Sequence, residues 1–532
     1  MNSVASRVSR TQSQTTLPRI VPIMKQDREK LANYGIGLLI AYAAVAEVVR
    51  AASTIFWPDE FWTLSVVRQP TIAGSWNALR RLDSQAPAFH FVERIAGALL
   101  PNQHIAYRLP SILALCCVVL CVFIFVRRRS GATYALICAL VPLVSTLYNY
   151  LAVEARGYAL ATACVAVALV CYQNAQALRW AVFMGLSLAA ASAFHYYGVF
   201  AVVPLALAEA AFFWRTRQLR WGAWLGIAAG VLPLVIFWPM LSTLGRGMGA
   251  HYWRGTQPSL TNIVEVYGAF FTIQYPMGLA LAAVATLGVV EAWLPTRFRR
   301  DELLQSLKDD EFVHERVLVL GLLALPFIFC FAMKVVHGGL LARYLMETVL
   351  GFALAVGFIL PRLQRNGVIL AGAMLFSVFA LQEANFWVIH RHNLGKVGSP
   401  TASVEDLLNA AGRPDLPVVV SDGSEYVQFA HYAARETVNR YVALVDAPAA
   451  MTYAGSDFVD NELVALQTYS PLQVYEFRDF VAKYPQFFLY SGGNPTWDWW
   501  PTRLLDEHYT LRLVGMHDND KLYLVAKSSG ND

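Results

Sequence analysis

Two adjacent carboxylates, Asp59 and Glu60, lie in the aromatic segment IFWPDEFWTL, residues 55–64, directly after a long apolar run. Charged side chains at the level of a bilayer are costly and usually mark a function. Apolar surroundings raise the pKa of a carboxyl group, which suits a general base that works near neutral pH. We therefore identify both acids as candidate catalytic residues and Trp57 as a candidate positioning residue. The alternative is a solvated acidic pair flanked by aromatic anchors at the membrane interface.

A second polar group lies in VEARGYAL, residues 153–160. Glu154 and Tyr158 are four residues apart, so they share one face of a helix. Arg156 lies between them, and an arginine can bind phosphate through two parallel hydrogen bonds. The segment provides two candidate substrate-positioning residues and one candidate phosphate ligand. Charges that only mark the end of a membrane span are the alternative.

A third group lies in MKVVHGGLLARYL, residues 333–345. Lys334 and Arg343 are candidate ligands for an anionic group, and His337 and Tyr344 are candidates for substrate positioning. The orientation rule disfavours positive charge outside the cytoplasm, so an anion held at the membrane surface would explain these residues. The alternative is a short loop whose basic residues meet lipid phosphates.

The segment GRGMGAHYWRGTQ, residues 245–257, combines glycines, aromatic residues and a further candidate phosphate ligand, Arg254. It is typical of a loop that covers a substrate, although a glycine-rich loop without function fits equally well. The sequence contains no P-loop, no dinucleotide-binding fingerprint and no HExxH motif. Its seven cysteines all lie in apolar runs, which predicts neither a disulfide framework nor a zinc site.

The composition shows which elements must position these residues. Of the 532 residues, 56% are hydrophobic and only 15% are charged, against about 25% charged in soluble proteins. The apolar residues form runs that match the thickness of a bilayer. We therefore predict a polytopic α-helical membrane protein with eleven spans, at 34–53, 106–126, 132–149, 157–173, 180–197, 199–214, 221–241, 276–294, 317–334, 343–360 and 367–388.

Lysine and arginine cluster in alternate connections between these spans, which places those connections in the cytoplasm. Residues 1–30 are then a flexible cytoplasmic tail, and residues 31–389 form the membrane domain. The outer loop at 55–105 carries the acidic pair, and residues 390–532 form an outer domain. All three candidate groups and Arg254 fall on the outer side.

The outer domain at 390–532 has the pattern of a small α/β layer protein. LPVVVSDG is typical of a buried strand that ends in a turn, and SEYVQFAHYAA of the helix that follows it. Three further segments, QFFLYSG, YTLRLVGM and KLYLVAK, predict strands.

Five motifs in this order resemble the membrane glycosyltransferases of the GT-C fold. They are the acidic pair, DSQAPAFHFVERIAG (83–97), YRLPSILAL (107–115), EARGYAL (154–160) and RYL (343–345). Within that group the chain is most similar to bacterial relatives of the protein O-mannosyltransferases and of the lipid A aminoarabinose transferase. One position departs from the pattern, because Gln85 stands where family members usually carry a histidine.

The resemblance implies an inverting transferase that takes a sugar from a polyprenyl-phosphate donor. Asp59 would be the general base for the acceptor hydroxyl, with Glu60 beside it. The departing phosphate would be neutralised by Arg343 and Lys334, with help from Arg156. The acceptor would be a glycan, lipid or protein of the cell envelope, with lipopolysaccharide modification among the expected activities. No cofactor is certain, and participation of a divalent metal ion stays open.

The resemblance also implies a multi-pass protein of the bacterial inner membrane, with its active site and outer domain in the periplasm. The bilayer is then a partner, and nucleic acid is not. The main alternative is a transporter or flippase of lipid-linked glycans, which would carry ionisable residues near the bilayer midplane. Glu209 is the one charged residue well inside an apolar stretch. Because the middle of the spans is otherwise nearly free of charge, the pattern favours chemistry at the membrane surface over transport. A third hypothesis is a non-catalytic receptor or scaffold that acts through its outer domain.

Overall fold

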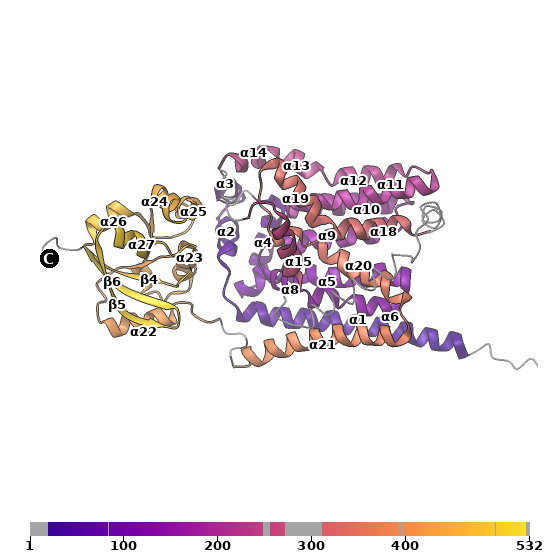
Figure 1. The fold of residues 1–532 in the computed structure, drawn as a ribbon, viewed down its shortest axis with the longest axis horizontal. Helices are drawn as coiled ribbons and strands as arrows, with labels where there is room; N and C mark the ends of the chain where they lie inside the picture. The colour runs from indigo at the N-terminus through magenta and orange to yellow at the C-terminus, as the bar shows by residue number, and fades with distance from the viewer. Residues whose placement is uncertain are drawn as a thin grey trace, which may run out of the picture.

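The computed structural model describes residues 20–82, 85–247, 256–271, 311–392, 394, 397–494 and 496–527. A bundle of apolar helices forms its larger part (Figure 1). In chain order, the helices of the bundle are α1 (Ile20–Ser53), α5 (Gln103–Ser130), α6 (Ala132–Cys138), α7 (Val141–Val144), α8 (Thr146–Leu151), α9 (Tyr158–Tyr172), α10 (Leu178–Phe194), η1 (Tyr196–Ala201), α11 (Val202–Thr216), α12 (Trp221–Ala229), α13 (Leu232–Ile236), α14 (Trp238–Gly247), α15 (Leu260–Phe270), α18 (Val313–Leu323), α19 (Leu325–Val336), η2 (Ala342–Leu345), α20 (Thr348–Ile359), η3 (Leu360–Arg362) and α21 (Arg365–His390).

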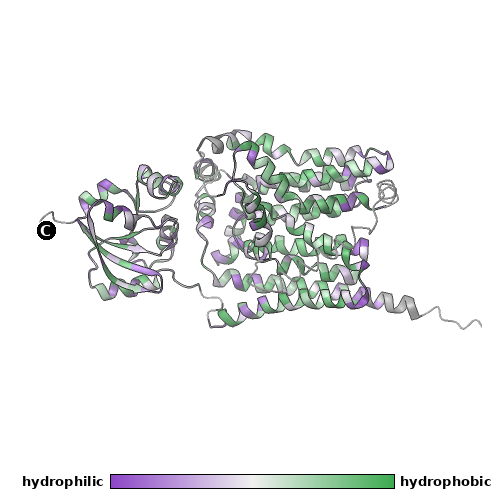
Figure 2. Ribbon diagram, in the orientation of Figure 1, coloured by the Kyte–Doolittle hydropathy of each residue, from purple (hydrophilic) through white to green (hydrophobic). Residues whose placement is uncertain are grey.

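These helices confirm a polytopic α-helical membrane protein. Within the described residues, four helices are long and apolar enough to cross a bilayer, and α18 with α19 would form a fifth span bent by 55°. Five shorter apolar helices accompany them. Together they coincide with ten of the eleven predicted ranges, and the range 276–294 lies outside the described residues. Figure 2 shows hydrophobic residues along the helices of the bundle.

Prolines break three of the ranges that the sequence presents as continuous. Pro142, Pro233 and Pro326 each lie at the first or second position of a new helix, after a short interruption. A proline has no N–H for the preceding turn and clashes with it, so the chain restarts the helix there. At the N-terminus α1 begins at Ile20, so residues 20–30 extend the first span as helix. The rest of the predicted tail, residues 1–19, lies outside the described residues.

The predicted outer loop 55–105 forms three helices, α2 (Pro58–Val67), α3 (Ile72–Leu82) and α4 (Pro87–Leu99). Figure 1 shows α2 and α3 between the bundle and the C-terminal domain.

The C-terminal domain has the predicted α/β fold. Its six-stranded sheet has the order β3-β2-β1-β4-β6-β5. The neighbouring strands β3, β2, β1 and β4 run parallel to one another. β6 pairs antiparallel with both β4 and β5. The elements are α22 (Ala402–Ala411), β1 (Val418–Val420), α23 (Gly423–Tyr432), η4 (Val438–Arg440), β2 (Tyr441–Val445), α24 (Ala447–Tyr453), α25 (Phe458–Leu466), β3 (Val474–Glu476), α26 (Phe477–Lys483), β4 (Gln486–Ser491), α27 (Trp500–Asp506), β5 (Tyr509–His517) and β6 (Asp520–Lys527).

The C-terminal domain contacts the segment that leads into α2. The backbone N–H of Phe56 donates to the Tyr432 hydroxyl at 2.7 Å, and the Gln428 amide donates to the Phe56 carbonyl at 2.9 Å. The ring of His104 stacks on Phe56, with centroids 4.2 Å apart. Both backbone polar groups of Phe56, three residues before Asp59, are therefore bound by this domain.

Candidate functional site

Asp59 lies in the first turn of α2, with about a third of its side chain exposed (32%). Its Oδ2 atom accepts a hydrogen bond from Arg343 Nη1 at 2.7 Å. Arg343 belongs to the short helix η2, which directly precedes α20. The positive end of the α2 dipole and the guanidinium both place positive charge beside this side chain. The structure thus brings together the predicted base and a predicted phosphate ligand.

Glu60 is fully buried and bound on both carboxylate oxygens. Arg108 donates to it from Nε at 2.9 Å and from Nη2 at 2.7 Å. The backbone N–H groups of Trp57 and Ala155 each donate at 2.7 Å. Four donors satisfy the carboxylate and fasten α2 to α5 and to the segment after α8. Glu60 therefore connects these three segments, and both of its carboxylate oxygens are engaged in doing so.

Arg108 is a residue of the site that sequence reasoning missed. Besides Glu60, its guanidinium donates to the carbonyls of Ala51, Thr54 and Ile55 at 2.8 to 3.0 Å. These carbonyls belong to the end of α1 and the residues after it, where a cation is favourable. The motif that contains Arg108 was part of the family resemblance, but an arginine beside a long apolar run gave no further signal.

The segment between α8 and α9 places Arg156 and Glu154 beside α2. Arg156 is buried and donates from Nη1 to the Asp59 carbonyl at 3.1 Å and to the Thr63 hydroxyl at 3.3 Å. Burial, reinforced by the negative charges of Glu60 and Asp59, raises the pKa of Glu154 to about 8. The side chain is therefore mostly protonated at neutral pH, and it adds little negative charge beside Asp59.

Aromatic side chains form the wall of the site next to Arg343. The ring centroid of His195 lies 4.8 Å from that of Tyr158 and 5.8 Å from that of Tyr344. The ring centroid of Tyr197, in η1, lies 4.7 Å from that of Tyr344. Tyr158 and Tyr344 are predicted site residues, whereas His195 and Tyr197 were missed. The only sequence signal for the missed pair was the FHYYG break between two apolar runs.

A glycine allows this wall to approach the segment that carries Arg156. A Cβ atom on Gly157 would lie 2.2 Å from the carbonyl oxygen of Phe194, the residue before His195. Any other residue would push the turn after α10 away from the start of α9. Close contact between these two segments thus requires glycine at this position.

Glu93, on α4, is a second residue that sequence reasoning missed. It is fully buried, and neither carboxylate oxygen has a hydrogen-bond partner within the described residues. Burial, together with the negative charge of Glu60, raises the pKa of Glu93 well above its usual range. Burial therefore favours the neutral form of this acid. It sits in the motif at 83–97, where the sequence drew attention to Gln85 instead.

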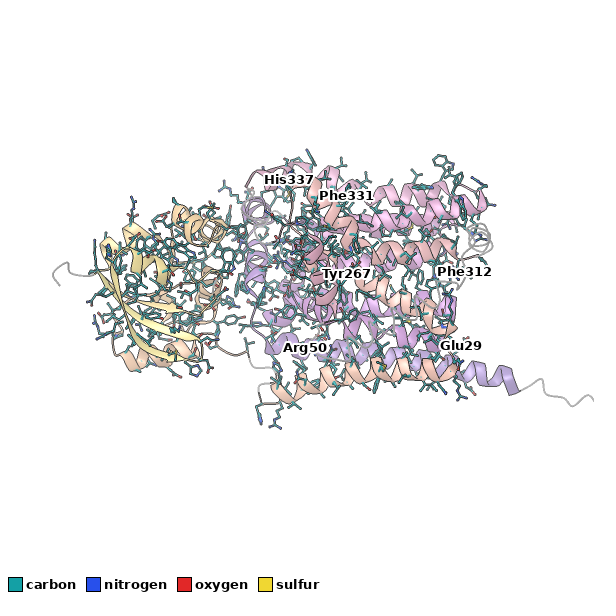
Figure 3. All side chains as sticks on the ribbon, viewed as in Figure 1. Glu29, Arg50, Tyr267, Phe312, Phe331 and His337 are labelled. Atoms are coloured by element: carbon teal, nitrogen blue, oxygen red, sulfur yellow. The ribbon has the colours of Figure 1, made fainter. Side chains whose placement is uncertain are left out.

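Two other predicted site residues, Lys334 and His337, do not join the group around Asp59 through described contacts. Lys334 and His337 are exposed at the end of α19, and Figure 3 shows His337 at the end of the bundle nearest the C-terminal domain. Trp57 is half-exposed and packs edge-on against Tyr150, with ring centroids 6.3 Å apart. Arg254 lies outside the described residues. Among the described residues, no three His, Cys, Asp or Glu side chains are grouped to hold a metal ion.

Several buried charges of the bundle form ion pairs near its ends. Arg50 binds Glu47 and Glu383 at 3.2 Å, and Figure 3 shows Arg50 at the end nearest the C-terminal domain. Glu209 forms an ion pair with Arg220, which lies in a predicted cytoplasmic connection. Glu29 and Phe312 lie at the end of the bundle away from the C-terminal domain (Figure 3).

Comparison with known proteins identifies the fold. By sequence, no family model and no curated protein matches the chain. By structure, the chain is similar to the crystal structure of ArnT from Cupriavidus metallidurans in the apo state, with 13% identity and a TM-score of 0.56 over 93% of this chain and 98% of that one. The structure of ArnT bound to undecaprenyl phosphate matches with 13% identity and a TM-score of 0.51, over 93% and 99% of the two chains. The chain therefore has the fold of ArnT, which confirms the GT-C membrane fold that its motifs predict.

Proposed function

We propose that this protein transfers a sugar from a polyprenyl-phosphate donor to an acceptor of the cell envelope, with inversion at the anomeric carbon. The contact between Asp59 and Arg343 carries the proposal, because it places a carboxylate base next to a cation suited to phosphate. The fold shared with ArnT, one of whose structures holds undecaprenyl phosphate, supports the class of donor.

In the proposed reaction, Asp59 accepts the proton of the acceptor hydroxyl as that oxygen attacks the anomeric carbon. The bond between this carbon and the phosphate oxygen breaks, and the phosphate leaves with the electron pair. Because a lipid phosphate is a good leaving group, one carboxylate suffices where glycosidases need two. A positioned base contributes on the order of 10²–10⁴-fold to the rate.

Arg343 is well placed to stabilise the departing phosphate. Only Nη1 of its guanidinium binds Asp59, and its buried Nε has no partner within the described residues. A guanidinium has five N–H donors in a planar fork, so Arg343 can bind the carboxylate and a phosphate oxygen together. Lys334, Arg254 and His337 are proposed to contact the donor lipid at the surface of the site.

The remaining residues of the site have supporting roles in this proposal. Arg156 fixes the start of α2 through the Asp59 carbonyl, and Glu60 fixes it through Arg108. Glu154 is mostly neutral at pH 7, so it can donate a hydrogen bond without repelling the donor phosphate. Tyr158, Tyr344 and Trp57 provide apolar surface that would keep water away from the reacting atoms.

The distribution of charge favours transfer over transport. The candidate residues gather at the end of the bundle next to the C-terminal domain, whereas a transporter binds its substrate near the midplane. The arginines 127–129, 215, 217 and 220 lie in connections that the orientation rule assigns to the cytoplasm. We propose that the site and the C-terminal domain face the periplasm of a bacterial inner membrane.

A genetic experiment tests this function even while the sugar is unidentified. Mass spectrometry would compare the envelope lipids, polysaccharides and glycoproteins of a deletion strain with those of the parent strain. We expect one glycan to lose one sugar in the deletion strain and to regain it with the wild-type gene, but not with Asp59→Asn. An unchanged envelope, or full restoration by Asp59→Asn, would contradict the proposal.

A further inference from the structure

The contact between the C-terminal domain and the start of α2 contains a stack of three rings, with His104 in the middle. His104 lies in the first turn of α5. Its ring centroid is 4.2 Å from that of Phe56, with 13° between the ring planes, and 5.9 Å from that of Tyr432, with 22° between the planes. Phe56 lies just before α2, and Tyr432 ends α23 of the C-terminal domain. The imidazole therefore links the two parts of the protein.

Beside this stack, the two parts meet through neutral groups. The hydroxyl oxygens of Ser65 and Ser470 lie 2.7 Å apart, and the Gln69 amide donates to the Tyr469 carbonyl at 3.2 Å. Residues of α2 and α23 also pack in one apolar cluster. None of these groups can compensate a charge that appears inside the interface, so docking of the domain depends on the charge of His104.

The hydrogen bonding of His104 suits the neutral imidazole. The half-buried ring has a hydrogen bond to the backbone of Thr54. Its Nδ1 atom is buried and has no hydrogen-bond partner within the described residues. Protonation would place an N–H on this nitrogen, where the described residues provide no acceptor, and a buried donor without an acceptor is costly.

The charges around His104 also oppose protonation. Arg108 follows one turn later on α5, Arg68 lies at the end of α2, and His431 on α23 adds positive charge when it is protonated. The N-terminal end of a helix, where His104 lies, is itself unfavourable for a cation. Glu60, the acid that binds Arg108, already accepts four hydrogen bonds. A second cation next to Arg108 would therefore be poorly compensated.

Docking and protonation of His104 are thus linked. His104 belongs to the predicted outer loop and precedes the span that begins at residue 106. Burial, reinforced by the positive charges of Arg108 and His431, lowers the pKa of His104 to about 4. Separation of the two parts would remove Tyr432 from the ring and return the histidine towards its ordinary pKa of about 6.5. Docking is then strongest above about pH 6.5 and weakens as the pH falls from there towards about 4.

We propose that neutral His104 is a positioning residue that holds the C-terminal domain against the start of α2, and that its protonation releases this contact. The contact fixes Phe56, three residues before Asp59, through the stack and through the bond from its N–H to the Tyr432 hydroxyl. Release would loosen the segment that orients Asp59. Acid would slow transfer by this route, a consequence that rests on the proposed function, whereas the release itself does not.

Hydrogen exchange of the Phe56 amide measures docking without any transfer assay. This N–H is bonded to Tyr432 only while the domain is docked, so its protection reports the docked fraction. Full-length protein in detergent would be measured from pH 5 to pH 8, with each rate corrected for the exchange rate of an unstructured amide at the same pH. We expect protection to fall on the order of tenfold from pH 8 to pH 5. Amides of the central strand β4 should stay protected, which shows that the domain remains folded.

Variants without a protonatable group identify His104 as the source of the effect. His104→Phe keeps a ring in the stack, and His104→Gln keeps a polar side chain. Protection of Phe56 should be independent of pH in both, although docking is weaker in His104→Gln because the stack is lost. His517→Phe, at an exposed histidine of the same domain, is the matched control and should respond like the wild type.

Three results would overturn the proposal. They are absence of an acid response in the wild type, an undiminished response in both His104 variants, and a response that disappears only in His431→Gln. His431 is exposed and can bind a proton while the domain is docked, so we expect His431→Gln to keep most of the response.

Transfer kinetics connect docking to the reaction. Protonation of Asp59 lowers activity in acid in every variant, so the measured quantity is the ratio of kcat in His104→Phe to kcat in the wild type. We expect this ratio to rise several-fold from pH 8 to pH 5. A constant ratio, despite a change in Phe56 protection, would exclude the positioning role. Absence of transfer at every pH would contradict the proposed function, while the exchange data would still decide whether His104 controls docking.

Discussion

Arg343 Nη1 lies 2.7 Å from Asp59 Oδ2, although the two residues are 284 positions apart in the chain. The contact joins the first turn of α2 to the short helix before α20. It depends on the packing of several helices, because Arg156, and Arg108 through Glu60, fix α2 from two further segments. The carboxylate and the cation that the proposed reaction needs thus form one unit.

Two replacements of Arg343 should distinguish the contribution of its positive charge from that of its planar guanidinium. We expect Arg343→Ala to lower kcat/KM on the order of 10²–10³-fold, as for loss of a group that stabilises the transition state. Arg343→Lys should fall between this variant and the wild type, because lysine keeps the charge but not the planar fork. Steady-state kinetics with purified protein measure both, and Arg413→Ala, an exposed arginine of the C-terminal domain, is the control. Wild-type kinetics in Arg343→Ala would exclude the phosphate role.

The pair of Glu60 and Arg108 should matter for folding more than for chemistry. Removal of one partner from a buried ion pair leaves the other charge unpaired, which costs about 3–5 kcal/mol. We expect Arg108→Met and Glu60→Gln each to lower the free energy of unfolding in detergent, and the double variant to lose less than the sum. If Glu60→Gln keeps full stability but loses all transfer activity, Glu60 is catalytic instead.

Glu154 should make the protein sensitive to alkaline pH. Its pKa of about 8 lies above the ordinary carboxyl value, so the folded state holds a proton that the unfolded state releases. The stability that this proton contributes is complete below the ordinary carboxyl pKa and is lost as pH rises through about 8. Ionisation also adds a negative charge near the donor phosphate. We expect donor affinity to fall above this pH in the wild type and to stay constant in Glu154→Gln. The same alkaline loss in both proteins would assign it to another group.

Tyr432 should influence transfer although it belongs to the C-terminal domain. Its hydroxyl accepts the N–H of Phe56, and one such hydrogen bond contributes about 1 kcal/mol. We expect Tyr432→Phe to lower kcat several-fold with little change in the KM of the donor, because the segment before Asp59 becomes less fixed. Tyr523→Phe, in β6 of the same domain, provides a control for the loss of a tyrosine hydroxyl. Equal kinetics in the two variants would show that this contact has no part in the reaction.

Sequence reasoning located the residues whose charge was out of place. Asp59, Arg156 and Arg343 stood out because each lies at the end of an apolar run that the sequence predicts to be the outer one, where charge is costly. Distance along the chain hid their contact, which only the packing of the helices reveals. Arg108 and Glu93 gave no such signal, since an isolated charge in an amphipathic or apolar segment is common. His195 lay in what looked like a minor break between two spans.

The same limits apply to the secondary structure. The four predicted strands end in turns or alternate with polar residues, and they correspond to β1, β4, β5 and β6. The strands β2 and β3 were missed, because YVALV is short and continuously apolar and VYE has only three residues. A buried parallel strand lacks the alternation that identifies a half-exposed one. The order of strands within the sheet follows from pairing that the sequence does not display.

Replacement of Asp59 by asparagine tests the central claim most directly. The measurement is sugar transfer by the purified protein, with binding of the polyprenyl-phosphate donor and thermal unfolding recorded on the same sample. Asp518→Asn, an exposed aspartate of the C-terminal domain, is the matched control. We predict that Asp59→Asn lowers kcat on the order of 10²–10⁴-fold, keeps the fold and still binds donor, while the control retains full activity. Wild-type transfer by folded Asp59→Asn would contradict the proposed role of Asp59.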